Sequence, residues 1–393
     1  MPSARRDICG FPTQLRSSAL TKACADSTAF SRGSRPRPDL PAVKKPAPQR
    51  LEPIFSPRIW GARSLAPLYP EKSDLAEPLG EAWLSSFDSK ITTPEFRGKT
   101  LREAWHEMPA EWRGTRCASS EEFPLLVKFI FPTDMLSLQV HPDDAYAAVH
   151  EKAAGGRGKT EMWHVVSAEP GAELLFGLKP GSNKQEFLAR LKDETLESIF
   201  QPVDVRAGDT IFVPPGTPHA IGPGMIVIEV QEYSDLTYRV YDYGRVDAQG
   251  KPRELHIEKA LEVTNFASTF KGKTTHLPLS VSERDVERSL LAACPFFATE
   301  SWTSASPFEI PVSPSHFDLI VLLSGRGVLR STDFAFPVEQ GECWLLPANL
   351  QDCHFVPIEA TQMIRTYVPD IGVLREELQR GSRPASVDNT VFD

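Results

Sequence analysis

The sequence is short of long hydrophobic runs and of closely spaced cysteines. No stretch of ~20 consecutive apolar residues occurs, so we expect no membrane-spanning helix. The six cysteines include no CxxC pair, which argues against a disulfide framework and favours free thiols in a reducing compartment, the cytoplasm. Glycine, with 24 residues, is scarcer than proline, with 35, and this balance favours turns and short strands over long helices.

Net positive charge is confined to the first 50 residues. Residues 1–50 hold ten Lys and Arg against three Asp and Glu, a net charge of +7, and the whole chain carries −9, which leaves −16 for residues 51–393. The acidic body argues against nucleic acid as a partner. The basic segment has no apolar run after Arg5-Arg6, unlike a secretory signal, and its composition predicts a disordered extension over residues 1–50.

Strand patterns dominate the remaining sequence. Leu125 to Phe131 is a nearly continuous apolar run, and from Leu136 to His141 apolar and polar residues alternate. Alternation with a period of two places Gln139 and His141 on one face of a strand and the apolar residues on the other. The apolar face would hold Leu136, Leu138 and Val140. Further strands are expected at Glu161–Val166, Thr210–Val213, Ile226–Gln231 and Thr237–Tyr241.

The predicted organisation is a mainly β chain with a small helical part. Apolar residues at helical spacing predict one helix over Lys184–Phe200, and a second, shorter helix is expected over Glu254–Val263. After a linker near Phe266–Lys273 the strand pattern restarts, as expected for a second small β domain. The predicted divisions are residues 51–270, with the helical segment 184–200, then 274–380, and a frayed tail at 381–393.

Four polar residues form a candidate metal site. Gln139 and His141 share a strand face, Glu161 lies on a following strand, and His219 follows a rigid turn rich in proline. Two imidazoles and a carboxylate are a common catalytic metal set, and an amide oxygen adds a weak ligand. A lone histidine on a strand is more often a core or surface residue. The combination favours metal, although the residue types alone would also suit Fe, Mn or Co.

Several segments resemble known families. Gly208 and the run from Pro214 to His219 have the spacing of the second cupin motif, glycine, five residues, proline, any residue, glycine, two residues, histidine. Four stretches, in order, closely resemble type I phosphomannose isomerases of the short bacterial form. They are Leu136–Asp144, Gly158–Trp163, Pro215–Ala220 and Ser234–Asp242. The resemblance runs from about Leu51 to Val263 and continues weakly through the C-terminal domain.

The resemblance implies two cupin-type, jelly-roll β-barrel domains and a metal-dependent isomerase. Its activity would interconvert mannose 6-phosphate and fructose 6-phosphate through a cis-enediol, with a sugar phosphate as the small-molecule partner. One zinc ion per chain would be held by Gln139, His141, Glu161 and His219. Lys159 and Arg239 would contact the sugar and the developing charge, and Asp235 matches a carboxylate proposed for proton transfer. A monomer or homodimer is expected, with no membrane partner.

One departure from the family pattern and one feature of the second domain qualify this prediction. Longer members carry a histidine where this chain has Gly158, so the acid–base group that opens the ring is not assigned. The second domain has a cupin-like turn at Gly341–Asn349 but no histidine at the matching ligand position, which predicts a barrel without metal. The alternatives are another cupin metalloenzyme, such as a dioxygenase or a different sugar isomerase, and a non-catalytic sugar-phosphate sensor.

Overall fold

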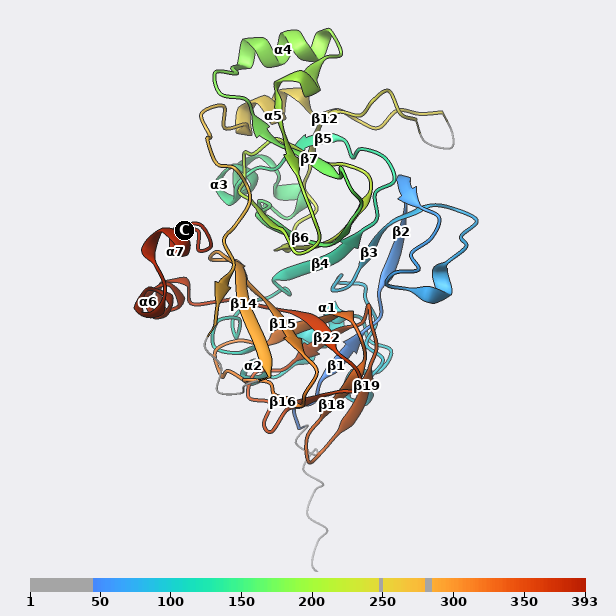
Figure 1. Cartoon of the computed structure of the whole chain (residues 1–393), viewed down its shortest axis with the longest axis vertical. Coiled ribbons are helices and arrows are strands. Elements are labelled where there is room, and N and C mark those ends of the chain that lie inside the picture. Colours follow the sequence, from blue (N-terminus) through green and yellow to red (C-terminus); the bar gives the residue numbers. More distant parts are fainter. Residues whose placement is uncertain (1–44, 247–249, 280–284) are drawn as a thin grey trace, which may run out of the picture. The chain divides into compact units, whose positions relative to one another are not determined.

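The computed structural model describes residues 45–246, 250–279 and 285–393, and within them antiparallel strands form four sheets (Figure 1). The six-stranded sheet has the order β2 (Ile54–Ala62), β3 (Leu79–Trp83), β4 (Leu125–Ile130), β11 (Met225–Glu232), β6 (Glu161–Ala168) and β9 (Thr210–Val213). The five-stranded sheet has the order β12 (Tyr238–Tyr241), β5 (Leu138–Val140), β10 (His219–Ile221), β7 (Glu173–Leu178) and β8 (Phe200–Asp204). We call these two sheets the N-terminal β-region.

The other two sheets form the C-terminal β-region. The seven-stranded sheet has the order β1 (Gln49–Leu51), β20 (Cys343–Leu346), β17 (Asp318–Ser324), β22 (Thr361–Tyr367), β15 (Ala298–Ser304), β14 (Val286–Ala293) and β13 (Leu277–Pro278). The four-stranded sheet has the order β16 (Phe308–Glu309), β21 (His354–Pro357), β18 (Gly327–Arg330) and β19 (Ala335–Val338). A mainly β fold is therefore confirmed, with a larger and a smaller sheet in each region, as expected of cupin-type domains.

Helices are short and lie between or beside the strands. The α-helices in the described residues are α1 (Leu101–Glu107), α2 (Ala110–Arg113), α3 (Asp144–His150), α4 (Lys184–Lys192), α5 (Ile257–Val263), α6 (Ile371–Gly381) and α7 (Pro384–Asp388). The 3-10 turns are η1 (Pro70–Lys72), η2 (Pro94–Phe96), η3 (Lys152–Ala154) and η4 (Leu196–Ile199). None of the helices in the described part of the chain has the length and apolar character needed to cross a bilayer.

The two faces of the five-stranded sheet carry different residues. Leu138 and Val140 on β5 pack outward with helices α4 and α5, which lie over this sheet in Figure 1. The inner face meets the six-stranded sheet in a core that includes Trp163, Phe176 and Val227. Gln139 and the residue after the strand, His141, therefore point between the two sheets, as their alternation predicts.

Several predictions at element ends are wrong. Leu136 does not pack with Leu138 and Val140, because β5 begins only at Leu138, and Leu136 belongs to the core between the sheets. The helix predicted over 184–200 stops at Lys192, since the next turn places Glu194 at a positive φ of 55° that an α-helix cannot accommodate. The chain does not fray from about residue 380, because α7 follows and both Val387 and Val391 are buried.

The start of the ordered chain also differs from the prediction. Gln49 is fully buried in β1, which pairs with β20, so residues 45–50 are not a disordered extension. Residues 1–44, which carry most of the predicted basic segment together with Cys9 and Cys24, lie outside the described residues. Within the described residues, the four remaining cysteines are free and buried. Burial raises the pKa of the Cys117 thiol to about 11 and that of the Cys294 thiol to about 12.

Candidate metal centre and active site

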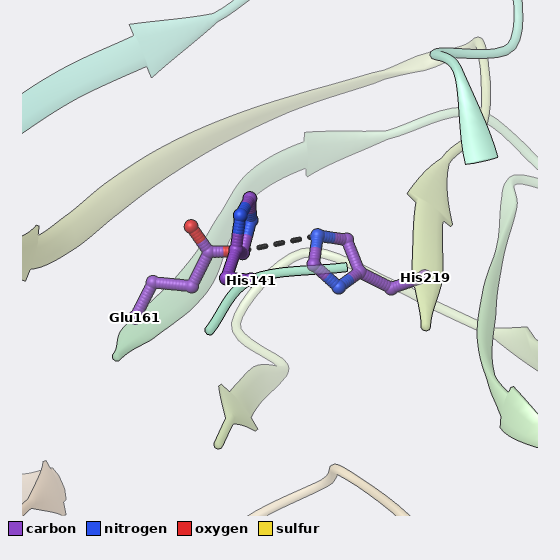
Figure 2. A group of neighbouring side chains, drawn as sticks. All are labelled: His141, Glu161 and His219. Atoms are coloured by element: carbon purple, nitrogen blue, oxygen red, sulfur yellow. Dashed lines mark ion pairs between the residues drawn. The ribbon is translucent and has the colours of Figure 1, made fainter. Parts of the chain in front are cut away.

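Three strands bring the predicted metal ligands together between the two sheets of the N-terminal β-region. His219 begins β10 and lies opposite Gln139 of β5, while Glu161 begins β6 in the facing sheet. Figure 2 shows the side chains of His141, Glu161 and His219 pointing toward one another. Their ligand atoms all lie within 4.8 Å of one another, and each of the three residues is at most 1% exposed.

Backbone carbonyls fix the protonation of both imidazoles. His141 Nδ1 lies 2.9 Å from the Leu236 carbonyl oxygen, and His219 Nδ1 lies 2.9 Å from the Thr217 carbonyl oxygen. Because a carbonyl oxygen only accepts, each Nδ1 carries the proton and each Nε2 of the neutral ring presents a lone pair. Burial lowers the pKa of His219 to about 3, and burial followed by the Lys159 charge lowers that of His141, so both rings are neutral at pH 7.

The three converging ligand atoms, two imidazole nitrogens and one carboxylate oxygen, are all acceptors, and no proton lies between them. Glu161 Oε1 lies 3.3 Å from His219 Nε2 and 3.5 Å from His141 Nε2, and within residues 45–246, 250–279 and 285–393 no group donates a hydrogen bond to this oxygen. An unsatisfied buried carboxylate oxygen is costly, and three converging lone pairs are stabilised by a cation placed among them. The donor set thus fits a divalent metal ion with nitrogen and oxygen ligands.

Gln139 lies beside this cluster with its amide nitrogen toward it. Gln139 Nε2 lies 3.2 Å from His219 Nε2 and can donate a hydrogen bond to that lone pair. Amide oxygen and nitrogen are nearly indistinguishable in shape, so rotating the amide by half a turn presents the oxygen instead. Coordination of a metal by Gln139 requires that rotated form.

Two lysines lie next to the ligands and share one buried carboxylate. Lys159 Nζ lies 2.6 Å from Glu161 Oε2 and 3.6 Å from Glu229 Oε1, and Lys128 Nζ lies 3.0 Å from the same Glu229 oxygen. Burial disfavours the charged lysines, but nearby carboxylates outweigh burial and raise the pKa of both, chiefly Glu229 for Lys128 and Glu161 for Lys159. Burial also acts to raise the pKa of Glu161, yet the Lys159 charge holds it well below its usual value. Both lysines and Glu161 are therefore charged at pH 7.

An open cavity of about 240 Å³ lies over this network. Lys159, Asp235 and Arg239 all line it, so the structure brings together the predicted catalytic residues beside the ligand cluster. The Asp235 side chain is 58% exposed and lies 3.6 Å from Lys128 Nζ, which places it at the mouth of the cavity. The Nη1 group of Arg239 donates to the Glu254 carbonyl oxygen at 3.1 Å, and its buried Nε has no hydrogen-bond partner among the described residues.

Sequence reasoning missed several residues of this cavity. Lys128 and Glu229 lie opposite each other on β4 and β11, and the Trp163 indole donates to Glu229 Oε2 at 2.9 Å. The available signal was a lysine inside an otherwise apolar strand, since a buried lysine requires an acidic partner. Arg58 and Arg253 also line the cavity, but they come from segments with no distinctive pattern, and only the fold places them here.

Comparisons with known proteins show a family resemblance over most of the chain. The family model described as "Phosphomannose isomerase type I, catalytic domain" matches residues 49–162. Mannose-6-phosphate isomerase ManA of Bacillus subtilis is 33% identical over 311 residues, which cover 77% of this chain and 94% of that protein. Mannose-6-phosphate isomerase of Streptococcus mutans is 33% identical over 314 residues, which cover 77% of this chain and 95% of that protein.

Solved structures show the same fold. The crystal structure of mannose 6-phosphate isomerase from Bacillus subtilis is 29% identical, superposes with a TM-score of 0.74, and covers 81% of this chain and 99% of its own. A zinc-bound mannose 6-phosphate isomerase has a TM-score of 0.62 at 17% identity and covers 82% and 99% of the two chains, which compares the fold alone. The chain therefore belongs to the type I phosphomannose isomerase family of enzymes.

Proposed function

We propose that this enzyme interconverts mannose 6-phosphate and fructose 6-phosphate by moving a proton between C2 and C1 through a cis-enediolate. The observation that carries the proposal is the convergence of His141, Glu161 and His219, without a proton among them, beside a cavity lined by cations. The relatives named above as mannose-6-phosphate isomerases support the choice of substrate. Catalysis belongs to residues 51–270 in this proposal, with residues 274–380 as a cupin-like domain lacking metal ligands.

The charge of the cavity fits an anionic sugar. In a chain with a net charge of −9, the lining holds five Lys and Arg against three Asp and Glu. These are Arg58, Lys128, Lys159, Arg239 and Arg253 against Glu81, Glu229 and Asp235. A positive cleft in an acidic molecule attracts anions selectively. We place the phosphate at Arg239 and Arg253, because Arg239 has no carboxylate partner within an ion-pair distance among the described residues.

Each remaining group takes a role from its chemistry. Gln139, His141, Glu161 and His219 would hold one divalent ion, and zinc is the first to test because the donor set suits it and a relative of the same fold is zinc-bound. Bound there, the ion supplies Lewis-acid polarisation of the sugar oxygens. Lys159 adds fixed positive charge where the enediolate develops, Arg239 contacts the sugar through its phosphate, and Asp235 carries the proton between carbons. The buried free thiols fit the cytoplasmic location that we include in the proposal.

A coupled assay tests the reaction and the metal site together. The protein is stripped with a chelator, zinc is returned, and fructose 6-phosphate formation from mannose 6-phosphate is followed. We expect zinc to restore turnover, and we expect His219→Ala to abolish both turnover and stoichiometric zinc binding, because one of the converging ligands is lost. His354→Ala, in the C-terminal β-region, is the matched control and should behave as the wild type.

Two outcomes would contradict the proposal. A folded protein that shows no turnover with zinc, iron, manganese or cobalt is not this isomerase. Full zinc binding by folded His219→Ala would remove the ligand assignment even if turnover were observed in the wild type.

A further inference from the structure

The segment that carries Lys159 and Glu161 is held by three consecutive amide hydrogen bonds. Gly158 N–H donates to Asp144 Oδ1 at 2.7 Å, Lys159 N–H donates to the Pro142 carbonyl oxygen at 3.0 Å, and Thr160 N–H donates to Glu232 Oε1 at 2.6 Å. Two of the three acceptors are thus side-chain carboxyl groups. Neither Asp144 nor Glu232 belongs to the lining of the cavity.

Close backbone packing leaves this segment no freedom on one side. A Cβ atom at Gly158 would lie 2.5 Å from the Asp143 carbonyl carbon and 2.6 Å from Asp144 N, distances that real Cβ atoms do not reach. The segment therefore lies directly against the loop that follows His141. Any side chain at this position would push Lys159 and Glu161 away from that loop.

The two carboxyl groups also interact through their charges. Glu232 is 5% exposed, and the charge of Asp144 acts on its carboxyl group. Burial, followed by the Asp144 charge, raises the pKa of Glu232 to about 7 from an ordinary value of 4.5. Glu232 therefore takes up a proton as the pH falls through about 7. The Glu232 charge also acts on the buried Cys294 thiol, which burial keeps neutral by raising its pKa to about 12.

We propose that Glu232 and Asp144 are positioning residues for the proposed isomerase site: by accepting the Thr160 and Gly158 amide hydrogen bonds, they fix the backbone of Gly158–Thr160, and through it the Lys159 ammonium and the Glu161 carboxylate. Groups that orient metal ligands from outside the ligand set typically contribute 10–100-fold to metal affinity or activity. Ligand and ammonium positions must be held to within about 0.5 Å for such a site to work. This inference rests on the proposed function for its activity readout, but its binding readouts do not require turnover.

The test compares two substitutions at one position. Glu232→Ala removes the acceptor for Thr160 N–H, and we expect about a 10–100-fold loss of zinc affinity or of kcat, with KM changed less. Glu232→Gln keeps a carbonyl oxygen for Thr160 N–H and supplies an N–H group for the Asp144 carboxylate, so it should restore both. Zinc affinity is measured by chelator competition, and hydrogen exchange reports the Gly158, Lys159 and Thr160 amides, which should exchange faster only in Glu232→Ala.

The pH profile separates positioning from a general loss of stability. As the pH rises through about 7, Glu232 ionises, two carboxylates oppose each other, and wild-type activity should fall. Glu232→Gln has no such proton to lose, so its alkaline limb should move to higher pH. Asp144→Asn should have the same effect, because the amide donates to an ionised Glu232 without repulsion.

Glu342, in the C-terminal β-region, provides the matched control. Glu342→Gln alters another largely buried carboxylate that accepts a backbone N–H, from Glu339, in the C-terminal β-region, and should change none of these measurements. Unchanged zinc affinity and amide exchange in Glu232→Ala would overturn the inference, whatever the activity. An alkaline limb that is identical in the wild type, Glu232→Gln and Asp144→Asn would also overturn it. Zinc effects without isomerase activity in the wild type would instead refute the proposed function alone.

Discussion

Arg239 is an arginine held beside other cations. Burial, and then the nearby Arg253, lowers the pKa of its guanidinium, although the group remains charged at neutral pH. Arg253 and Arg245 both bind the one carboxylate of Asp242, so little negative charge remains for Arg239. A substrate phosphate, with a charge near −2, would relieve this repulsion.

Arg253→Gln tests that placement of the phosphate. A hydrogen bond to a charged group contributes about 1.5–3 kcal/mol, so we expect KM for mannose 6-phosphate to rise by about tenfold or more, with a smaller change in kcat. Inhibition by inorganic phosphate should weaken in parallel. Arg330→Gln, an exposed arginine on β18, is the control. If KM and phosphate inhibition both stay at wild-type values, Arg253 does not bind the phosphate.

For individual residues, the sequence predicts the metal ligands better than the residues that contact them. The spacing of Gln139, His141 and His219 carries information because turns and strand alternation fix where neighbouring side chains point. The partners of a site come from distant segments, so Glu229 beside Lys128, or Glu232 beside Asp144, depends on which strands pair. Gly158 stood out in the sequence only because longer family members carry a histidine at this position. Its packing against the loop after His141 explains why no side chain fits there.

Among the elements, the last residues of the chain contact the N-terminal β-region, while α6 and α7 pack on the C-terminal β-region. Phe392 stacks on Phe212 of β9 with ring centroids 3.9 Å apart and planes 2° apart, and Phe392 N–H donates to the Ala293 carbonyl oxygen at 2.8 Å. Arg375 of α6 binds the side chain of Asp393 at 2.9 Å. The polar composition and short helices of the C-terminal segment do not indicate this packing, because it depends on two aromatic rings that are far apart in the sequence.

Phe392→Ala should therefore destabilise the protein. Fully buried Phe→Ala substitutions cost about 3–5 kcal/mol, and because Phe392 is half-buried we expect about 1–3 kcal/mol in the free energy of unfolding. Urea denaturation followed by tryptophan fluorescence measures the change. Val373→Ala on α6 removes a side chain that is 52% exposed and should stay within about 0.5 kcal/mol of the wild type. Equal stability of the two variants would show that the terminal residues do not pack as described.

Strands were predicted more reliably than helices for a physical reason. Alternation along β5, β6 and β11 reflects burial against two different layers, and that pattern is visible in the sequence itself. The segment 184–200 has apolar residues at helical spacing throughout, yet Thr195 and the left-handed Glu194 divide it into α4 and η4. Helix ends are decided by local turns and tertiary contacts that periodicity does not record.

Considered as a whole, the molecule has its largest apolar cluster between the two β-regions. Phe317, just before β17, lies 5.4 Å from the Trp105 ring of α1 and 5.1 Å from the Phe123 ring that precedes β4. All three side chains are fully buried, and the cluster continues into both larger sheets. The predicted boundary near residue 270 thus separates two patterns of strands that share one core.

Phe317→Ala should weaken both regions together. We expect a loss of about 3–5 kcal/mol in the free energy of unfolding, because a fully buried ring leaves a cavity at the junction. Tryptophan fluorescence and residual activity should be lost at the same, lower urea concentration. Ile358→Ala, at a position 61% exposed, should leave both transitions unchanged. Activity that survives after the fluorescence transition would show that the N-terminal β-region is stable without this contact.

The position of β1 has a consequence for the order in which the protein is made. Gln49 is paired with Leu345, so the first described strand completes a sheet whose neighbouring strand is synthesised much later. At a synthesis rate of ~5–20 residues per second, β1 waits ~15–60 s for that neighbour. During this interval its hydrogen-bonding edge is open to other nascent chains, and a chaperone that covers it would raise the yield of correctly folded enzyme.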